Sequence, residues 1–337
     1  MIKIIIDAFG GYYAPIEVVK GAILAVNSNE NIHVVLSGKK DQLSEELAKY
    51  KYNEKQISIL EANDVIDNNE SPTMAIKTKK DSSLVRAFDM AKEDEDVVGV
   101  ISAGSTGAVL TGGFLKLGRI KGVHRPALCP VFTTLTGGIV SICDSGANVD
   151  CDPINLKQFA IMGSLYLKNA YGKENPRVAL LNIGVEEEKG NKVSKEAYQL
   201  LKETKEINFV GNMESRDLLT GEYDLVVCDG FDGNVLIKST EGTAMELMKL
   251  LKKTLTSSLK NKIGAALIKK SIYEIKDMMD YNNHGGGVML GTKKIVVKGH
   301  GSSKTSAVKN CIIQAYNIEQ SKLIEKISDE IAKMTEE

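Results

Sequence analysis

Six short segments rich in glycine and polar residues carry the side chains that could do chemistry in this chain of 337 residues. Each follows a short apolar run, and they span residues 7–11, 102–107, 144–148, 184–191, 229–234 and 299–303. Glycine lets the backbone approach a ligand closely, and lysine, asparagine and histidine side chains can donate hydrogen bonds. In an open parallel sheet, the loops at the carboxyl ends of the strands meet at one edge, where ligands bind. We therefore expect the six segments to converge on one polar site.

Two of these segments are suited to an anion, since each precedes a helical pattern. Residues 104–107 read Gly-Ser-Thr-Gly, and residues 301–303 read Gly-Ser-Ser. Free backbone N–H groups and the positive end of a helix dipole would hold phosphate there. Ordinary capping of the helix by serine or threonine is the alternative interpretation at both places.

Familiar catalytic and nucleotide-binding motifs fail when they are tested against the chain. Residues 299–304 begin like G-x-G-x-x-G but lack its third glycine, and they also lack the glycine that precedes lysine in a P-loop. No G-x-S-x-G nucleophile elbow occurs, and the four histidines show no ligand spacing, so no metal site is expected. Asp229 and Asp232 could hold Mg²⁺ beside a phosphate, but an Asp-Gly-x-Asp-Gly segment is more often a turn.

The elements that must position these segments follow from alternating apolar runs and helical patterns. Strands are expected at residues 2–6, 33–36, 57–60, 97–101, 127–132, 138–143, 178–183, 207–210, 224–228 and 295–298. Helices are expected at residues 16–26, 43–50, 83–92, 106–117, 154–169 and 194–206, with one long closing helix over 303–333. This alternation predicts an α/β fold, a three-layer α/β/α sandwich with a mostly parallel sheet. One catalytic domain is expected over residues 1–337.

A protruding amphipathic helical arm is expected at residues 242–280 within this domain. Residues 249–270 contain seven lysines and no acidic residue. The apolar residues beside the lysines fall on one helical stripe, namely Leu255, Leu259, Ile263 and Leu267. Gly264 is expected to mark a bend between two helices. Such an arm can lie on an anionic membrane surface, pack its stripe against a second subunit, or do both.

The composition restricts the class of protein. The 43 basic and 44 acidic residues give a formal net charge of -1, so no nucleic-acid partner is expected. The five cysteines include no C-x-x-C pair, and their odd number leaves no complete disulfide framework, which indicates reduced thiols in the cytoplasm. The uncharged stretch 126–143 is long enough to cross a membrane, but its prolines and paired glycines favour two buried strands.

In their order along the chain, the motifs resemble those of a known family. They are Asp7-Ala8-x-Gly10-Gly11-x-x-Ala14-Pro15, Lys79-Lys80-Asp81-Ser82-Ser83, Ser102-Ala103-Gly104-x-Thr106-Gly107-Ala108, Asp144-x-Gly146-Ala147-Asn148, Leu181-Asn182-Ile183-Gly184 with Lys189-Gly190-Asn191, Cys228-Asp229-Gly230-Phe231-x-Gly233-Asn234, and His300-Gly301-Ser302-Ser303. From about residue 2 to the final helix, the sequence closely resembles the bacterial phosphate acyltransferases of phospholipid synthesis, the acyl-ACP:phosphate transacylases. It departs from the family pattern at Phe9, Tyr12, Lys77, Ser105 and residues 287–288.

The resemblance implies transfer of a fatty acyl group from the thioester of acyl carrier protein to inorganic phosphate, giving acyl phosphate for phospholipid synthesis. Phosphate is itself the nucleophile, so neither a serine or cysteine nucleophile nor a cofactor is expected. The resemblance implies that Lys189 meets the phosphate charge, Asn234 meets the oxyanion, and His300 is a general acid for the leaving thiol. It further implies phosphate or substrate binding by Asp7, Gly10, Gly11, Gly104, Ser105, Thr106, Gly107, Asn148, Asn191, Asp229, Gly233, Ser302 and Ser303. A turn or surface role is the alternative for Lys189 and Asn234.

The resemblance also implies the isocitrate/isopropylmalate dehydrogenase-like fold and a homodimer. It implies a cytoplasmic enzyme peripherally associated with the inner face of the membrane, where a membrane-bound glycerol-3-phosphate acyltransferase would receive its product. Two alternatives remain open. One is an NAD-dependent dehydrogenase of the isopropylmalate type, which shares the fold and need not carry a dinucleotide fingerprint. The other is a non-enzymatic membrane-surface scaffold built around residues 249–270.

Overall fold

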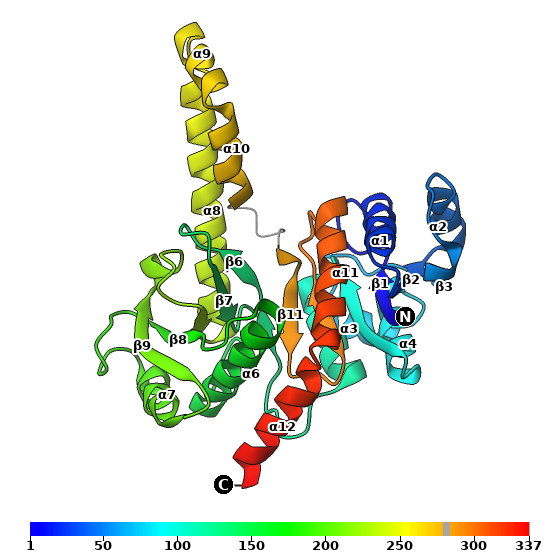
Figure 1. The fold of residues 1–337 in the computed structure, drawn as a ribbon. Helices are drawn as coiled ribbons and strands as arrows, with labels where there is room; N and C mark the ends of the chain where they lie inside the picture. Colours follow the sequence, from blue (N-terminus) through cyan, green and yellow to red (C-terminus); the bar gives the residue numbers. More distant parts are fainter. Residues whose placement is uncertain (279–283, 337) are drawn as a thin grey trace.

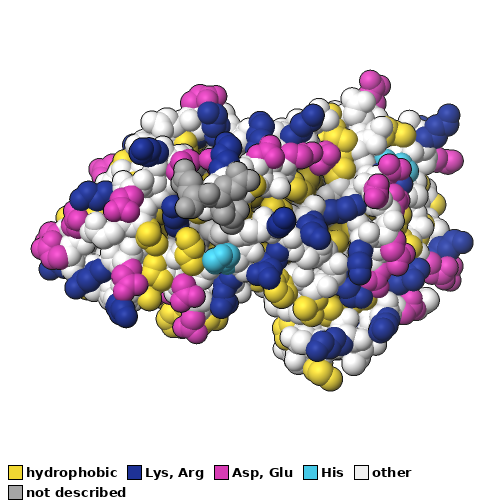
Figure 2. Space-filling model, turned by 90° about the horizontal axis from the view of Figure 1, so that it is seen from below, with side chains coloured by type: hydrophobic (Ala, Val, Ile, Leu, Met, Phe, Trp, Pro, Cys, Tyr) yellow, Lys and Arg dark blue, Asp and Glu magenta, His cyan; other side chains and the backbone are white. Residues whose placement is uncertain are grey.

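The computed structural model describes residues 1–278 and 284–336. Figure 1 shows two packed halves, each built on a β-sheet, and a helical arm that projects away from both. On the side opposite to the arm, acidic and basic side chains are interspersed over the surface (Figure 2). This mixture agrees with the near balance of 43 basic and 44 acidic residues.

The larger sheet has seven strands. Their order is β3 (Ile57–Glu61), β2 (Ile32–Gly38), β1 (Ile2–Asp7), β4 (Val97–Ser102), β12 (Ile295–Lys298), β11 (Gly287–Leu290) and β5 (Ala127–Cys129). The first five in this order are parallel, and β11 is antiparallel to both β12 and β5.

The smaller sheet has five strands, in the order β6 (Val131–Thr133), β7 (Ile139–Cys143), β10 (Leu225–Val227), β8 (Arg177–Asn182) and β9 (Asn208–Glu214). All of its pairs are parallel except β6 with β7. The predicted α/β fold with mostly parallel strands is thus confirmed.

The predicted strand at residues 127–132 is divided in two. Pro130 has no N–H to donate to a ladder, and it separates β5 from β6. Since β5 pairs with β11 and β6 pairs with β7, the chain passes from one sheet to the other at this point. The strands therefore form two sheets where the sequence analysis expected one.

Helices cover both faces of the sheets. They are α1 (Ile16–Ser28), α2 (Lys40–Leu47), α3 (Pro72–Thr78), α4 (Ser83–Glu93), α5 (Thr106–Gly112), α6 (Pro153–Tyr171), α7 (Lys192–Glu203), α8 (Gly230–Leu255), α9 (Leu259–Leu267), α10 (Lys269–Met278), α11 (Thr305–Gln320) and α12 (Leu323–Glu336). The predicted single closing helix is two helices, because Lys322 takes a left-handed conformation (φ 54°) between α11 and α12.

The alternation of side chains along β1 shows how the layers are made. Ile4 and Ile6 join the buried cluster that contains residues of α1 and α11, whereas Ile5 joins the cluster that contains residues of α4 and α5. The first cluster also includes α6 residues such as Phe159 and smaller-sheet residues such as Leu225. One continuous core therefore connects the two halves.

The arm is formed by the outer part of α8 together with α9 and α10 (Figure 1). The predicted apolar stripe is interrupted: α8 ends at Leu255, and Ser258 begins α9 by accepting a hydrogen bond from the Asn261 N–H. Gly264 lies within α9 and does not mark the bend. The last two residues of the predicted arm, 279–280, lie outside the described residues.

The stripe residues on α9 are largely exposed in this chain. The exposed fraction is 77% for Leu259, 59% for Ile263 and 83% for Leu267, whereas Leu255 is half-buried. Within the described residues, no helix is both long enough and apolar enough to span a bilayer. The exposed apolar residues are the kind of surface that a lipid interface or a second subunit would cover.

An ion-pair cluster ties the start of β8 to the start of β10. Asp224, with 6% of its side chain exposed, accepts hydrogen bonds from Arg177 Nε at 2.9 Å and from Lys173 Nζ at 3.0 Å. Burial alone would raise the pKa of the Asp224 carboxyl, but the Arg177 and Lys173 bonds outweigh it and lower that pKa to about 2.

Candidate active site

The loops that follow β1, β4 and β12 lie side by side, because these strands are parallel neighbours in the larger sheet. Hydrogen bonds join the loops: the Tyr12 N–H donates to the Gly301 carbonyl at 2.8 Å, and the Gly299 N–H donates to the Ser102 carbonyl at 2.9 Å. The predicted segments 7–11, 102–107 and 299–303 therefore meet at one edge of this sheet.

Asp7 is a buried strut of this edge. Its carboxylate accepts hydrogen bonds from Ser83 Oγ at 2.6 Å, from Ser102 Oγ at 2.7 Å and from the Phe9 N–H at 3.2 Å. Burial raises the pKa of the Asp7 carboxyl, and these hydrogen bonds oppose the shift. The side chain thus orders three segments around it.

Two glycines allow the first two loops to touch. A Cβ at Gly10 would lie 2.5 Å from Asp7 Oδ2 and 2.7 Å from the Gly104 nitrogen. Gly11 has a φ of +100°, which L side chains rarely adopt. Gly10 and Gly11, which the sequence analysis assigned to ligand binding, therefore allow the backbones of neighbouring loops to pack against each other.

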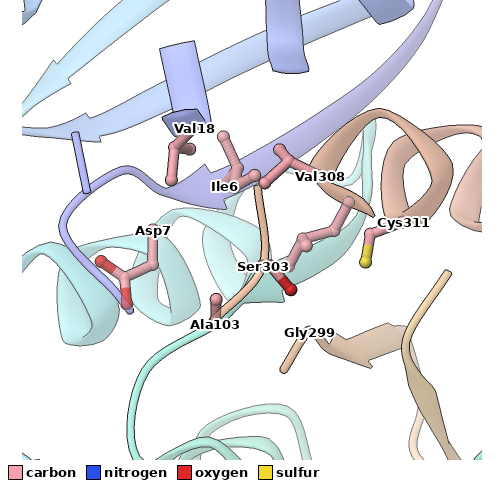
Figure 3. A pocket seen from close by; sticks show the side chains of 9 residues that line it. Ile6, Asp7, Val18, Ala103, Gly299, Ser303, Val308 and Cys311 are labelled. Carbon is pink, nitrogen blue, oxygen red and sulfur yellow. The ribbon is translucent and has the colours of Figure 1, made fainter. Parts of the chain in front are cut away.

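A small cavity of about 10 Å³ lies beneath these loops, with room for about one water molecule. Figure 3 shows Asp7, Ala103, Gly299, Ser303 and Cys311 around it. Ser303 is 6% exposed, and within the described residues its Oγ has no hydrogen-bond partner. A buried hydroxyl without a partner is unfavourable, so Ser303 is suited to meeting a ligand or a water molecule.

His300 is held in a defined orientation next to this cavity. Its Nδ1 lies 2.8 Å from Ser302 Oγ and accepts a hydrogen bond from the Ser302 N–H at 3.2 Å. In the neutral ring, Nδ1 then acts as the acceptor and Nε2 carries the proton. This arrangement makes the Nε2–H group of His300 a hydrogen-bond donor, whereas the predicted role of general acid requires the doubly protonated ring, in which Nδ1 cannot accept the bond from Ser302.

The helices that follow these loops differ in which groups accept hydrogen bonds from the N–H groups of their first turns. At α11, the Glu17 carboxylate accepts hydrogen bonds from the Thr305 N–H at 2.8 Å and from Thr305 Oγ1 at 2.5 Å, which lowers the pKa of Glu17. A carboxylate of the protein thus occupies part of the place that the sequence analysis assigned to phosphate. At α5, the Ser105 side chain makes no capping bond, so Ser105, Thr106 and Gly107 remain candidates for an anion.

The ends of the smaller sheet carry the remaining predicted residues. Because β7, β10 and β8 are adjacent and parallel, the segments 144–148, 229–234 and 184–191 meet at one edge. The Asp144 carboxylate accepts hydrogen bonds from the N–H groups of Leu128 at 2.8 Å and Asn148 at 2.7 Å. Asn148 is buried, and its Nδ2 donates to Asp144 Oδ2 and to the Pro126 carbonyl, so it braces the loop.

Helix α8 begins directly against this loop. The Gly230 N–H donates to the Asn148 carbonyl at 2.6 Å, and a Cβ at Gly233 would lie 1.9 Å from the Asp144 carbonyl oxygen. Asp229 caps the helix by accepting a hydrogen bond from the Asp232 N–H at 2.8 Å, and burial raises the pKa of its carboxyl. The close contact fixes the start of α8 and, with it, the exposed side chain of Asn234.

The loop after β8 presents Lys189 at the same edge. Asn182 Nδ2 donates to the Lys189 carbonyl at 3.1 Å, and Gly190 turns the chain with a φ of +98°. Asn191 then caps α7 by accepting a hydrogen bond from the Ser194 N–H at 2.9 Å. Lys189 and Asn234 are therefore exposed donors on segments that follow the adjacent strands β8 and β10.

The sequence analysis included Ser83, Ser102 and Asp144 in its motifs but assigned no role to them. Ser83 and Ser102 hold Asp7, and Asp144 holds the loop on which α8 rests. The residue that it missed is Lys298, the last residue of β12. Loss of hydration, with a smaller contribution from the positive charge of Lys238 on α8, lowers the pKa of the Lys298 ammonium to about 8. A lysine that ends an otherwise apolar strand was the available signal.

Four of the five cysteines do not offer an activated nucleophile. Burial raises the pKa of the Cys143 and Cys228 thiols well above the usual value, and it raises those of Cys151 and Cys311 to about 12. Since the thiolate is the reactive form, these four side chains are unreactive at neutral pH. In the part of the chain that the structure describes, no three His, Cys, Asp or Glu side chains are grouped so as to hold a metal ion.

Comparisons with known proteins give the relatives of this chain. A family model described as fatty acid synthesis protein matches residues 2–326. The phosphate acyltransferase of Clostridium acetobutylicum is 47% identical over 98% of this chain and 99% of its own, and that of Clostridioides difficile is 42% identical over 99% and 98%. A solved phosphotransacetylase from Streptococcus pyogenes has a TM-score of 0.61 at 15% identity, with 94% of both chains covered. The EutD phosphotransacetylase from Staphylococcus aureus has a TM-score of 0.57 at 15% identity, with the same coverage, so both solved structures share the fold.

Proposed function

We propose, from the premise that the chain belongs to the fatty acid synthesis protein family of phosphate acyltransferases, that it transfers a fatty acyl group from acyl carrier protein to inorganic phosphate. The observation that carries this proposal is the 47% identity to a phosphate acyltransferase over 98% of the chain. Family membership makes the protein an acyltransferase that acts with phosphate, and it favours this activity over a dehydrogenase or a scaffold. The acyl-carrier donor and the acyl phosphate product are the proposed part.

The reaction requires that the phosphate and the thioester be positioned against each other and that their negative charges be stabilised. A phosphate oxygen attacks the thioester carbonyl carbon, the new C–O bond forms, and the C–S bond breaks to release the carrier thiolate, which takes up a proton. Phosphate is already an anionic nucleophile, so the reaction needs no thiolate from the protein. This agrees with the raised pKa of the Cys143, Cys151, Cys228 and Cys311 thiols. What the protein must supply is donors for two negative partners and for the oxyanion that develops.

The exposed donors at the edge of the smaller sheet suit these tasks. Asn234 stabilises the oxyanion, and Lys189 offsets the phosphate charge from the neighbouring loop. His300, with Nδ1 held as an acceptor by Ser302, presents an Nε2–H group that can donate a hydrogen bond to the sulfur of the leaving thiolate, which takes its proton from the solvent. Ser105, Thr106 and Ser303 add hydroxyl donors on the larger sheet.

The partners follow from the chemistry of the donor and the product. Acyl carrier protein is acidic, so lysines near the site would guide its docking. Acyl phosphate is amphipathic and is handed to a membrane-bound glycerol-3-phosphate acyltransferase. A cytoplasmic homodimer bound to the inner face of the membrane through the lysine-rich arm would deliver it there.

Trapping of the product tests the proposal. Purified protein, acyl carrier protein carrying a fatty acyl thioester, and inorganic phosphate are incubated with hydroxylamine, which converts acyl phosphate to a hydroxamate. Hydroxamate that depends on both the protein and phosphate supports the proposal. A yield no greater than that of the reaction without protein would refute it.

A further inference from the structure

Tyr12 is a side chain of the candidate site to which the proposed function gives no role. It is one of the positions at which the sequence departs from the family pattern. It lies where the loops after β1, β4 and β12 meet, and it is 70% exposed. Because so little of the ring is buried, Tyr12 contributes little to the hydrophobic core. It instead contacts a neighbouring loop.

That loop is the His300 loop, residues 299–303, and Tyr12 contacts its middle residue. The Tyr12 N–H donates to the Gly301 carbonyl at 2.8 Å. The ring lies against the same residue, because a Cβ at Gly301 would be 3.2 Å from Tyr12 Cε2 and 3.5 Å from Cζ. Since Gly301 has no side chain, the ring packs directly on its backbone. Both the backbone and the ring of Tyr12 therefore hold Gly301.

Gly11 brings Tyr12 to this position. It has a φ of +100°, a conformation that glycine adopts at little cost. A Cβ at Gly11 would be 3.0 Å from Ala103 Cβ and 3.2 Å from the Gly301 carbonyl oxygen. The missing side chain thus lets the first loop lie against both neighbouring loops. The contact between Tyr12 and Gly301 follows from this turn.

Gly301 joins the two residues that set the orientation of the imidazole ring. The Ser302 N–H donates to His300 Nδ1 at 3.2 Å, and Ser302 Oγ lies 2.8 Å from the same nitrogen. Both contacts depend on the backbone conformation of Gly301, which lies between them in the chain. Glycine has more backbone freedom than any other residue, and a ring packed on it reduces that freedom. A contact that fixes Gly301 thus also fixes the His300 side chain.

The residues that follow this loop are held by different side chains. The Glu17 carboxylate accepts a hydrogen bond from the Thr305 N–H at 2.8 Å. Lys304 Nζ lies 5.5 Å from the centroid of the Tyr13 ring. Both contacts come after Ser303, so they anchor the start of α11, whereas Tyr12 contacts the turn that precedes it.

We propose that Tyr12 is a positioning residue that acts through Gly301 on His300, with an effect on rate that rests on the proposed acyl transfer. The ring keeps His300 Nδ1 bonded to Ser302, so that the Nε2–H group stays available as a donor to the leaving sulfur. Tyr12 acts on the reaction through this loop rather than by binding a substrate. The order of the loop and the rate of acyl transfer are measured separately.

Amide hydrogen exchange measures the order of the loop without any substrate. The N–H groups of Ser302 and Ser303 donate to His300 Nδ1 and to the His300 carbonyl, so they exchange when the loop opens. We expect Tyr12→Ala to speed exchange in residues 299–303 by about tenfold, the change that corresponds to the buried part of the ring. Tyr12→Phe should exchange like the wild type, because its ring can pack on Gly301 in the same way.

Kinetics distinguish a positioning role from a general loss of structure. Tyr12→Ala should lower kcat by about tenfold and leave the KM for phosphate and for acyl carrier protein within about twofold, as expected for an interaction that acts only in the transition state. Tyr12→Phe should restore kcat. In the His300→Ala background, Tyr12→Ala should cause no further loss, because the residue through which it acts is gone.

Tyr13→Ala is the matched control. Tyr13 is the next residue of the same loop, it is 46% exposed, and its ring contacts Lys304 at the start of α11. This variant should change neither the exchange of residues 299–303 nor kcat. An equal loss in Tyr13→Ala would assign the effect to the whole loop and would overturn the inference.

Four other results would also overturn it. They are unchanged exchange in Tyr12→Ala, additive losses in the double variant, a His300→Ala protein with wild-type kcat, and a rise in KM that grows with the length of the acyl chain. The last would mean that the ring binds the substrate. A wild type that forms no acyl phosphate would refute the proposed function instead, and the exchange measurement would still decide whether Tyr12 orders the His300 loop.

Discussion

Substitution of Gly233 tests how the site is built. A Cβ at this position would lie 1.9 Å from the Asp144 carbonyl oxygen and 2.9 Å from Cys228 Sγ, closer than real Cβ contacts come. Both neighbours are buried, and the nearer one is backbone, so it cannot rotate away. In Gly233→Ala, α8 and the 144–148 loop must therefore separate by about 1 Å.

The expected magnitudes follow from this displacement. Overpacking of a dense interior costs about 1–3 kcal/mol, and replacing a helical glycine by alanine returns about 0.5–1 kcal/mol. We therefore expect Gly233→Ala to lower the free energy of unfolding by about 1–2 kcal/mol. Because the same shift moves Asn234, kcat should fall by about 10²-fold, the loss typical of a misplacement of 1 Å.

Gly242→Ala is the matched control on the same helix. A Cβ at Gly242 meets nothing within 4 Å, so this variant should be slightly more stable than the wild type and fully active. Urea denaturation and the hydroxamate assay measure the two properties for both variants. A Gly233→Ala protein with wild-type stability and wild-type kcat would show that the contact with Asp144 does not position Asn234.

Lys189→Ala and Asn234→Ala should each lower kcat by about 10²–10³-fold with little change in unfolding temperature, because both side chains are exposed; near-wild-type turnover in both would exclude their assigned roles. Asp224→Asn should lower the free energy of unfolding by about 2 kcal/mol at pH 7, because the folded-state pKa of about 2 lies below the ordinary 3.8. That stabilisation is complete above about pH 4 and is lost as the pH falls through about 2, so a stability difference that does not shrink in acid would contradict the ion-pair origin. Several hundred millimolar salt should raise the KM for acyl carrier protein, and an unchanged KM would argue against electrostatic docking. Leu259→Glu combined with Ile263→Glu should abolish co-sedimentation with anionic vesicles and leave the dimer mass intact; a fall to monomers, or a wild type that ignores such vesicles, would assign the arm to a subunit interface.

Much of the fold follows from local patterns in the sequence. The run Ile-Ile-Ile before Asp7 and the apolar strands after it are readable because strands buried on both faces are apolar throughout. The division of the strands into two sheets was not readable. It depends on the pairing of β5 with β11, which is distant in the sequence, and on the pairing of β6 with β7 in the other sheet. Pro130 indicates that the predicted strand is broken, but it does not indicate that the two parts join different sheets.

The candidate site shows the same limit. Residue type identified Asp7 and Asn148 as polar groups at strand ends, but it could not distinguish a side chain that binds substrate from one that holds neighbouring loops in place. That distinction is made by Ser83 and Ser102, which lie 76 and 95 positions from Asp7 in the chain. Lys298 escaped attention for a related reason, because its desolvation arises from elements that only the fold brings together.

The most direct test of the central claim measures both products of one reaction. Free thiol on the carrier and trapped acyl phosphate are quantified together, with and without inorganic phosphate. Phosphate acyl transfer predicts one thiol released for each acyl phosphate formed, and no thiol release above the no-enzyme rate when phosphate is omitted. Thiol release that proceeds without phosphate, or that leaves no acyl phosphate behind, would contradict it.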